Sequence, residues 1–371
     1  MLRRGAGGAL LGLGLSLGAR PLPAVLALPR EARGEPATLR KRRRAAIEAG
    51  CRFIAKSQRK GDGAFGNNNG VVAITALSVL ALMADGSTDG RGRYGKAIRR
   101  GLDFLLDLIE HPKRPDDWPP GYFYHPQDPS SKMHGQGYAT LALATAIGTS
   151  SGRRAARMQA VLKKAVACIE QAQTATGGFG YDPTPAGDHE GSVTVAVAQG
   201  LRAARDVGIP TSANVASRGL YYLKRSQNRD GSFRYSVYVE RSTYALTAAA
   251  LSSFFLYGRY TDDREKTMGR GLDYMMRRIP VVRSQRRWYY YGNFYAAWAC
   301  WQKDGGRWDA ASGGYWARWA REMLPHILGE QKRDGSWEDK VDQFEFGTVL
   351  PTAFACLTLS VPDETLPIFQ R

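Results

Sequence analysis

The sequence has little of the chemistry that metal and redox sites need. Among its 371 residues there are four cysteines and five histidines, and no two cysteines have the Cys-x-x-Cys spacing of structural zinc sites. We therefore predict no cofactor and no structural metal site.

Long apolar runs are missing beyond the N-terminus, so no transmembrane helix is expected in the mature chain. Arg3 and Arg4 precede an apolar stretch, Ala9–Leu17, and small residues follow in "PAVLA". This order is typical of a secretory signal peptide. We expect a signal peptide at 1–27, a flexible basic lead-in at 28–44, and export to the periplasm or cell envelope. The general secretory and twin-arginine routes both stay open.

Acidic residues are fewer than basic ones, 34 against 52, which gives a net charge of +18. Such a surface favours anionic partners, for example an anionic envelope surface. The charge is scattered apart from "RKRRR" at 40–44, and no nucleic-acid-binding motif is present. We expect no nucleic-acid partner, and an ordinary solvated basic surface remains an alternative to a dedicated anion site.

One short phrase is repeated along the chain. Gln, three residues, Gly, one residue and an aromatic ring occur as "QTATGGF" (173–179), "QNRDGSF" (227–233) and "QKRDGSW" (331–337). A looser copy with one extra residue, "QRKGDGAF", lies at 58–65. An amphipathic helix is predicted before each copy and a small-residue apolar helix after it.

The chain contains six such helix pairs. The first helices are expected to begin near Ala46, Ala97, Val161, Val215, Thr267 and Trp316. The second helix of the first pair and that of the last pair are as apolar as those in the middle. An open solenoid, by contrast, needs polar repeats at both ends. We therefore predict an all-α fold in one domain, an α6/α6 toroid spanning 45–362, with a C-terminal tail at 363–371.

The repeated phrase is explained by structure alone. Gly tolerates the positive φ of a sharp reversal after an outer helix. The Gln amide can bond backbone groups left open at the helix end, and the aromatic ring can pack on the next unit. The second and fifth units lack the phrase and carry aromatic clusters instead.

The cysteines are expected to be unpaired and mostly buried. Cys300 and Cys356 occupy matching positions in neighbouring predicted helices, whose axes lie about 8–10 Å apart. Side chains that point the same way from such helices are too far apart to bridge. Cys51 and Cys168 fall in non-adjacent repeats.

The stretch "RGLYYLKRSQNRDGSF" (218–233) resembles the QW motif of squalene-type triterpene cyclases. Residues 46–362 resemble the prenyltransferase and squalene oxidase repeat family, and this resemblance implies a terpenoid cyclase/protein prenyltransferase α6/α6 toroid. The family's Asp-x-Asp-Asp acid and its Asp-x-Cys zinc pair are absent, and "CIEQ" (168–171) lacks the glycines of a thioester. The resemblance therefore implies an apolar or isoprenoid-like ligand and leaves catalysis open.

The candidate catalytic residues lie where inner helices are predicted to begin, near the central cavity. "GDHEGS" (187–192) places Asp188, His189 and Glu190 side by side, and His134 comes from the preceding unit. These residues could transfer protons, or two histidines and a carboxylate could hold a divalent metal. Alternatively, the acids cap the helix that follows.

Further candidates could line an apolar, cation-tolerant pocket. They come from "GYFYH" (121–125), "WYYYGNFY" (288–295) and the starts of other inner helices: Tyr122, Tyr124, Gln136, Tyr289, Tyr291, Asn293 and Glu345. The same rings could instead provide packing in place of the missing phrase.

Three functions remain open. The first is a toroid that binds an apolar or isoprenoid-type molecule in its central cavity, as a prenyltransferase or terpene-cyclase-like enzyme if it is catalytic. The second is a non-catalytic envelope scaffold with a ring filled by side chains. The third is an α6/α6 sugar lyase or glycosidase, which would need a carboxylate pair such as Glu345 with Asp188 or Glu190.

Overall fold

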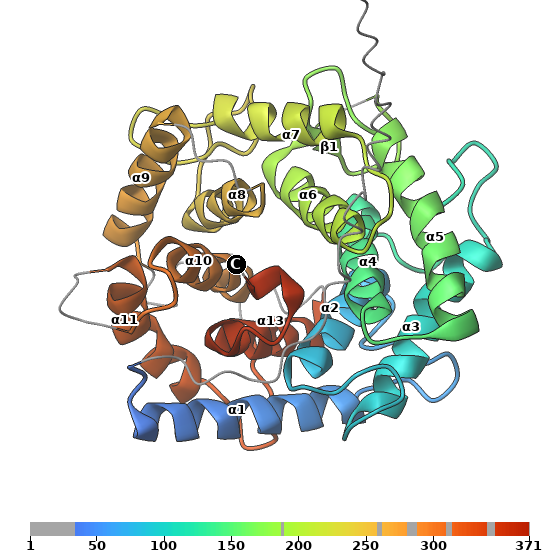
Figure 1. Ribbon diagram of the computed structural model, residues 1–371, viewed down its shortest axis with the longest axis horizontal. Coiled ribbons are helices and arrows are strands. Elements are labelled where there is room, and N and C mark those ends of the chain that lie inside the picture. Colours follow the sequence, from blue (N-terminus) through green and yellow to red (C-terminus); the bar gives the residue numbers. More distant parts are fainter. Residues whose placement is uncertain are drawn as a thin grey trace, which may run out of the picture.

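Twelve α-helices in the described part of the chain form two concentric rings (Figure 1). This computed structural model describes residues 34–186, 189–257, 262–279, 288–308, 314–339 and 346–370. The outer ring consists of α1 (Ala37–Lys56), α3 (Gly95–Glu110), α5 (Gly152–Gln171), α7 (Ala213–Arg225), α9 (Asp262–Arg277) and α11 (Tyr315–Gly329). The inner ring consists of α2 (Val71–Ala84), α4 (Lys132–Ile147), α6 (Gly191–Asp206), α8 (Tyr244–Leu256), α10 (Tyr289–Lys303) and α13 (Val349–Ser360). The predicted all-α, α6/α6 toroid is confirmed.

The two rings differ in composition because they differ in surroundings. The inner helix α2 is buried at every residue except Ala73, as expected for a helix enclosed by other helices. Inner helices also pack closely: at the α4–α6 contact, a Cβ on Gly137 would lie closer than 3.0 Å to the backbone of Ala196. The outer helix α3 buries Ile98 and Leu102 and exposes Arg100.

The repeated phrase joins each outer helix to the next. The amide nitrogen of Gln227 donates to Gly231 O of its own loop at 3.2 Å and to Thr267 O of the following outer helix at 2.8 Å. Phe233 is buried, and its N–H donates to Thr247 Oγ1 of the inner helix. The other three copies make the same amide bonds, from Gln58, Gln173 and Gln331. The predicted structural role is confirmed, with the next outer helix as an additional partner.

The second unit makes these contacts with a residue of its inner helix. Gln136 of α4 accepts the N–H of Phe123 at 2.9 Å and donates to Gly121 O at 2.9 Å and to Ala165 O of α5 at 3.2 Å. One glutamine thus replaces both the threonine and the loop glutamine of the four units that carry the phrase. The missing phrase is therefore compensated, with Gly121 and Phe123 in its Gly-x-aromatic positions.

A buried charge cluster closes the ring. Arg43 of α1 donates to Glu35 Oε1 at 2.8 Å and to Asp363 Oδ1 at 2.7 Å, and all three side chains are buried. Gln331, at the end of α11, donates to Ala46 O of α1 at 2.9 Å. The flexible lead-in predicted for 28–44 is thus wrong from Ala37 onward, because α1 begins there and the two acids hold Arg43 in the interior, while Lys41 and Arg42 of the basic run stay exposed.

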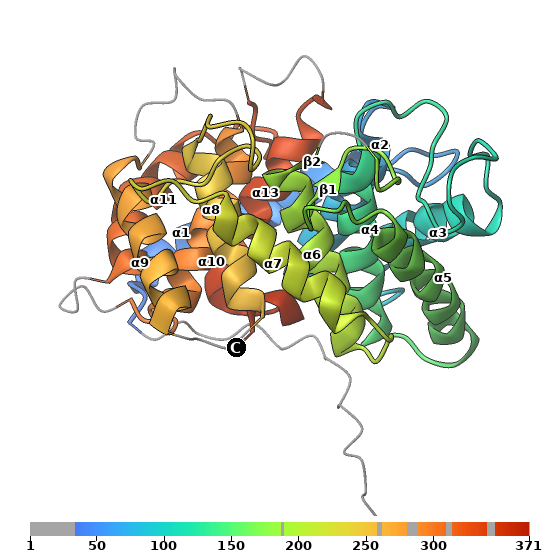
Figure 2. The same cartoon turned by 90° about the horizontal axis from the view of Figure 1, so that it is seen from above.

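The C-terminal residues also belong to the fold. After α13, the short helices η3 (Val361–Asp363) and η4 (Pro367–Phe369) cross the ring. Phe369 is buried, with its ring centroid 6.1 Å from Phe294 and 6.3 Å from Trp298. The edge-on view places this C-terminal end on the opposite side from β1 and β2 (Figure 2). The predicted tail is therefore a packed segment.

Three expectations concern the chain as a whole. The predicted signal peptide, 1–27, lies outside the described residues. Among those described, no helix combines the length and apolar character needed to cross a membrane. All four cysteines are buried and free, as expected.

Candidate functional site

The charged candidates lie on the face of the rings where the inner helices begin. The two-residue strands β1 (Phe179–Gly180) and β2 (His189–Glu190) pair antiparallel there, directly before α6. Adjacent residues of a strand point to opposite sides. His189 therefore faces Tyr222 of α7, with its Nδ1 2.9 Å from the hydroxyl, and does not join Glu190.

Glu190 caps the helix that follows it. Its carboxylate accepts the N–H groups of Ser192 at 3.0 Å and Val193 at 2.8 Å, and the favourable helix dipole adds to these bonds. The capping interpretation is thus confirmed for Glu190. Asp188, the other acid of this cluster, lies outside the described residues.

Glu190 also belongs to a hydrogen-bonded chain that reaches the surface. Ser192 Oγ donates to Glu190 Oε1 at 2.5 Å, and His134 Nε2 lies 2.8 Å from the same Ser192 oxygen. Because the serine hydroxyl donates its hydrogen to the carboxylate, the serine oxygen must accept the hydrogen bond from His134. His134 therefore carries its proton on Nε2 when neutral, which leaves Nδ1 as a proton acceptor.

The surroundings of His134 favour this neutral form. Burial lowers its pKa below the ordinary 6.5, and the nearby Glu190 carboxylate opposes the shift. The side chain is still 21% exposed, so a small molecule can reach the imidazole. A neutral, oriented and accessible imidazole has the properties of a general base at neutral pH.

Two tyrosines stand beside this histidine. The ring of Tyr181 lies 5.8 Å from that of His134, and its hydroxyl is 2.8 Å from the hydroxyl of Tyr235. Lys132 lies over the Tyr181 ring and Arg241 over the Tyr235 ring. This group gives the site hydroxyl donors and positive charge.

An apolar hollow adjoins the polar group. It has a volume of about 30 Å³ and is lined by Trp288, Tyr290, Tyr291, Asp339, Phe346, Gly347, Leu350, Pro351 and Phe354. Burial raises the pKa of Tyr291, and Ser192, beside its hydroxyl, opposes the rise. Tyr291 therefore lies between the hollow and Ser192 of this chain, although its buried hydroxyl has no hydrogen-bond partner among the described residues.

Below the hollow, side chains fill the axis of the ring. The hydroxyls of Tyr138 and Tyr295 lie 3.1 Å apart, and Tyr295 donates to Gln199 at 3.1 Å. Phe294 and Phe354 pack beside them, 5.7 Å between centroids, and all five side chains are buried. The deep central pocket predicted from the sequence is thus occupied at this level by the ring's own side chains.

The candidates of the second unit serve packing. Tyr122 and Tyr124 make edge contacts with Trp118, at 5.0 and 5.5 Å between centroids. Gln136 is fully buried, and its amide oxygen and nitrogen both bond to the backbone. The structure does not bring these three residues to the His134 group.

The candidate residues of the fifth unit have different positions and roles. Tyr291 lines the hollow, whereas Tyr289 is buried against Tyr290 at 4.9 Å. Asn293 is buried and donates to Tyr289 O at 3.0 Å, which makes it a structural residue of α10. Glu345 lies outside the described residues, so the proposed carboxylate pairs remain predictions.

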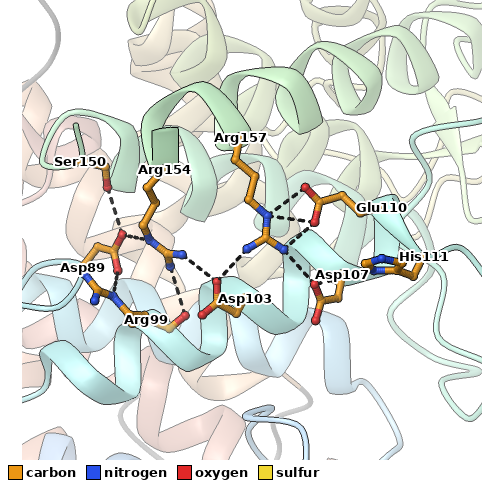
Figure 3. Close-up of polar contacts among 9 residues, drawn as sticks. All are labelled: Asp89, Arg99, Asp103, Asp107, Glu110, His111, Ser150, Arg154 and Arg157. Atoms are coloured by element: carbon orange, nitrogen blue, oxygen red, sulfur yellow. Dashed lines mark hydrogen bonds and ion pairs between the residues drawn. The ribbon is translucent and has the colours of Figure 1, made fainter. Parts of the chain in front are cut away.

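A metal site formed by His134, His189 and a carboxylate is not supported, because the two histidines face different partners. In the described ranges, Asp107, Glu110 and His111 are the group whose ligand atoms come close enough to hold an ion. Arg157 of α5 donates hydrogen bonds to both acids, at 2.9 Å to Glu110 and 2.8 Å to Asp107. Figure 3 shows its guanidinium between them. The group is better explained as part of an ion-pair ladder between α3 and α5.

Sequence reasoning missed several residues of this face, namely Ser192, Tyr181, Tyr235, Trp288 and Phe346. Ser192 carried a usable signal, because it stands at the first turn of a helix directly after an acid. The tyrosines gave none, since their loops meet only in the folded ring.

No protein-family model matches the sequence, and no curated protein matches it. Among solved structures, a variant of the type II terpene cyclase MstE from Scytonema, in complex with geranylgeranyl dihydroxybenzoate, is similar with a TM-score of 0.56 and 16% identity. The match covers 88% of this chain and 99% of that one. An unsaturated glucuronyl hydrolase from Bacillus sp. GL1 has a TM-score of 0.60 and 14% identity over 85% of this chain and 95% of its own.

A family 76 glycoside hydrolase from a bovine Bacteroides thetaiotaomicron strain has a TM-score of 0.58 and 11% identity, over 86% of this chain and 77% of its own. The chain therefore shares the α/α toroid of terpene cyclases and glycoside hydrolases. At these identities the similarity concerns the fold alone.

Proposed function

We propose that this toroid binds an apolar, isoprenoid-type molecule at the face where the inner helices begin, with His134 as the proton acceptor of the site. The observation that carries the proposal is the position of Tyr291, which lines an apolar hollow and stands beside Ser192 of the His134–Ser192–Glu190 chain. The fold neighbour in complex with geranylgeranyl dihydroxybenzoate supports the choice of ligand class.

The hollow sets a condition on binding. Its 30 Å³ is room for about one water molecule, whereas ligand pockets usually measure about 300–1,000 Å³. Trp288, which is 40% exposed at the rim, must therefore move outward when a ligand enters. The apolar chain would lie on Phe346 and Leu350, with its polar end toward His134.

Binding is tested by equilibrium dialysis of the protein against geranylgeraniol. Leu350→Glu places a charge in the lining, and Leu328→Glu is the matched control, because Leu328 is a half-buried leucine on the outer helix α11. We expect saturable retention by the wild type and the control, and at least about tenfold weaker binding by Leu350→Glu. Absence of saturable retention by the wild type, or equal loss in both variants, would contradict the proposal.

The proton acceptor is tested separately with geranylgeranial in D₂O. An unsaturated aldehyde has an acidic γ-proton, so a base that removes it speeds deuterium uptake, which mass spectrometry measures. We expect faster uptake with the wild type than with His134→Gln, while both retain the aldehyde. If deuterium uptake is equally fast with the wild type and with His134→Gln while both still bind the aldehyde, the proposed binding site would stand but His134 would not be its base.

The filled axis favours a second candidate, a non-catalytic envelope scaffold. The side chains of Tyr138 of α4 and Tyr295 of α10 meet inside the ring, with their hydroxyls 3.1 Å apart, and both are buried. This candidate predicts no retained isoprenoid and sedimentation with phosphatidylglycerol vesicles, weakened by salt because the attraction is electrostatic.

A further inference from the structure

Closure of the ring brings together two cysteines from opposite ends of the chain. Cys51 lies on the first outer helix, α1, and Cys356 on the last inner helix, α13. The sulfur of Cys356 is 4.0 Å from the carbonyl oxygen of Ile47, one turn before Cys51 on α1. Both thiols are fully buried.

The two thiols lie next to each other. Each donates to a backbone carbonyl, Cys51 Sγ to Ala81 O at 3.7 Å and Cys356 Sγ to Ile47 O. The neighbouring Cys356 thiol, together with burial, raises the pKa of Cys51 well above its ordinary value. Gly50 makes the approach possible, because a Cβ at this position would lie closer than 3.0 Å to the Cys356 sulfur. The missing side chain thus provides the space in which the second sulfur reaches α1.

We propose that Cys51 and Cys356 form a disulfide bond that locks the first outer helix to the last inner helix when the chain meets a small-molecule disulfide oxidant. The thiolate of one cysteine attacks the oxidant, forming a mixed disulfide and releasing one thiol. The second cysteine attacks the protein sulfur of that mixed disulfide and releases the other thiol. Two protein thiols are oxidised, and one disulfide is reduced to two thiols.

The other two cysteines provide an internal control. Cys168 lies on α5 and Cys300 on α10, and both are buried. Burial raises the pKa of Cys168 to about 12 and that of Cys300 well above its ordinary value. In the described parts of the chain, neither has the thiol contact that joins Cys51 to Cys356.

Burial also determines how the bond would form. The thiolate is the reactive species, and a raised pKa keeps the Cys51 thiol of the folded chain protonated. We therefore expect oxidation while the chain folds, or in open states that expose the two helices.

The experiment has two arms, both on the full chain. In one arm the native protein is incubated with glutathione disulfide in sub-denaturing urea; in the other it is refolded from urea in glutathione buffer. Free thiols are then alkylated, and a non-reducing tryptic digest is analysed by mass spectrometry. We expect one cross-linked peptide, Cys51 to Cys356, and two alkylated thiols, Cys168 and Cys300.

Variants make the result specific. Cys168→Ala/Cys300→Ala should form the same cross-link, whereas Cys51→Ala should form none. The oxidised wild type should melt at least about 5 °C above the reduced protein, because the bond closes a long loop. Four free thiols in both arms, with native helix content by circular dichroism, would overturn the proposal, as would cross-links that involve Cys168 or Cys300 equally. None of these readouts depends on the proposed ligand.

Discussion

The imidazole of His134 makes stability depend on pH. Its pKa is lowered by burial in the folded chain, whereas in the unfolded chain it is near 6.5. At a pH between these two pKa values, His134 is protonated in the unfolded chain and neutral in the folded chain. The contribution to stability is therefore complete above pH 6.5 and is lost as the pH falls below it.

We predict that His134→Gln flattens the fall in the free energy of unfolding between pH 7 and pH 5, measured by urea denaturation at each pH. His111→Gln is the control, because the His111 side chain is 79% exposed and should leave the slope unchanged. His125, whose pKa is also lowered by burial, keeps part of the slope in both variants. A slope that is as steep in His134→Gln as in the wild type would contradict the prediction.

A single residue in the second unit replaces two residues of the others. Gln136→Leu removes the partners of Phe123 N, Gly121 O and Ala165 O, three buried backbone groups. We expect a loss of about 2–4 kcal/mol in the free energy of unfolding. Gln136→Thr, which copies the residue of the other units, should recover part of the loss by accepting the Phe123 N–H. Equal stability of the two variants would show that this bond contributes nothing.

At the scale of elements, the link between one outer helix and the next depends on a glycine. Gly231 has a φ of +95°, and a Cβ there would lie closer than 3.0 Å to Arg270 O of the next outer helix. An alanine at this position thus meets both an unfavourable backbone conformation and the backbone of a neighbouring helix.

The two effects can be separated by comparison with Gly208. This glycine has a φ of +82° and open space around its Cα. We expect Gly208→Ala to cost about 1–2 kcal/mol of unfolding free energy, from the left-handed conformation alone, and Gly231→Ala about 1–3 kcal/mol more. If both variants lose the same unfolding free energy in urea denaturation, the close contact between Gly231 and the next outer helix would contribute nothing to the loss.

The elements also show how far the sequence can be interpreted. The apolar inner helices and the spacing of the Gln-Gly-aromatic phrase predicted all six units, because both arise from local requirements of burial and chain reversal. Gln136 was assigned to a ligand site because its backbone partners lie on a loop and on another helix. His189 and Glu190 were grouped by sequence proximity, but a strand of two residues points them apart.

At the scale of the whole molecule, Arg43 holds the two ends of the described chain together. Its removal would leave Glu35 buried without its partner, and Asp363 with Arg44 at 3.1 Å in place of two arginines. We predict that Arg43→Ala lowers the free energy of unfolding by about 3–5 kcal/mol, whereas Arg42→Ala, at the exposed neighbouring position, changes it by less than about 0.5 kcal/mol. Limited proteolysis should then cleave near α1 first; unchanged cleavage would show that other contacts close the ring.

The sequence predicted that the ring closes, but not which side chains meet at its seam. The first and last units are the most distant in sequence, so Cys51 and Cys356 were not considered as a pair, although a ring makes their units neighbours. The C-terminal segment, predicted as a tail, likewise packs Phe369 against Phe294 and Trp298 of the inner helix α10.

The seam between α1 and α13 has a consequence for biosynthesis. A ribosome releases α1 early, but the surface that α1 covers is completed only when Asp363 has left the exit tunnel. Throughout elongation the apolar face of α1, which includes Ile47 and Ile54, therefore lacks its contact with α13, which makes the nascent chain a natural client for chaperones until its final residues arrive.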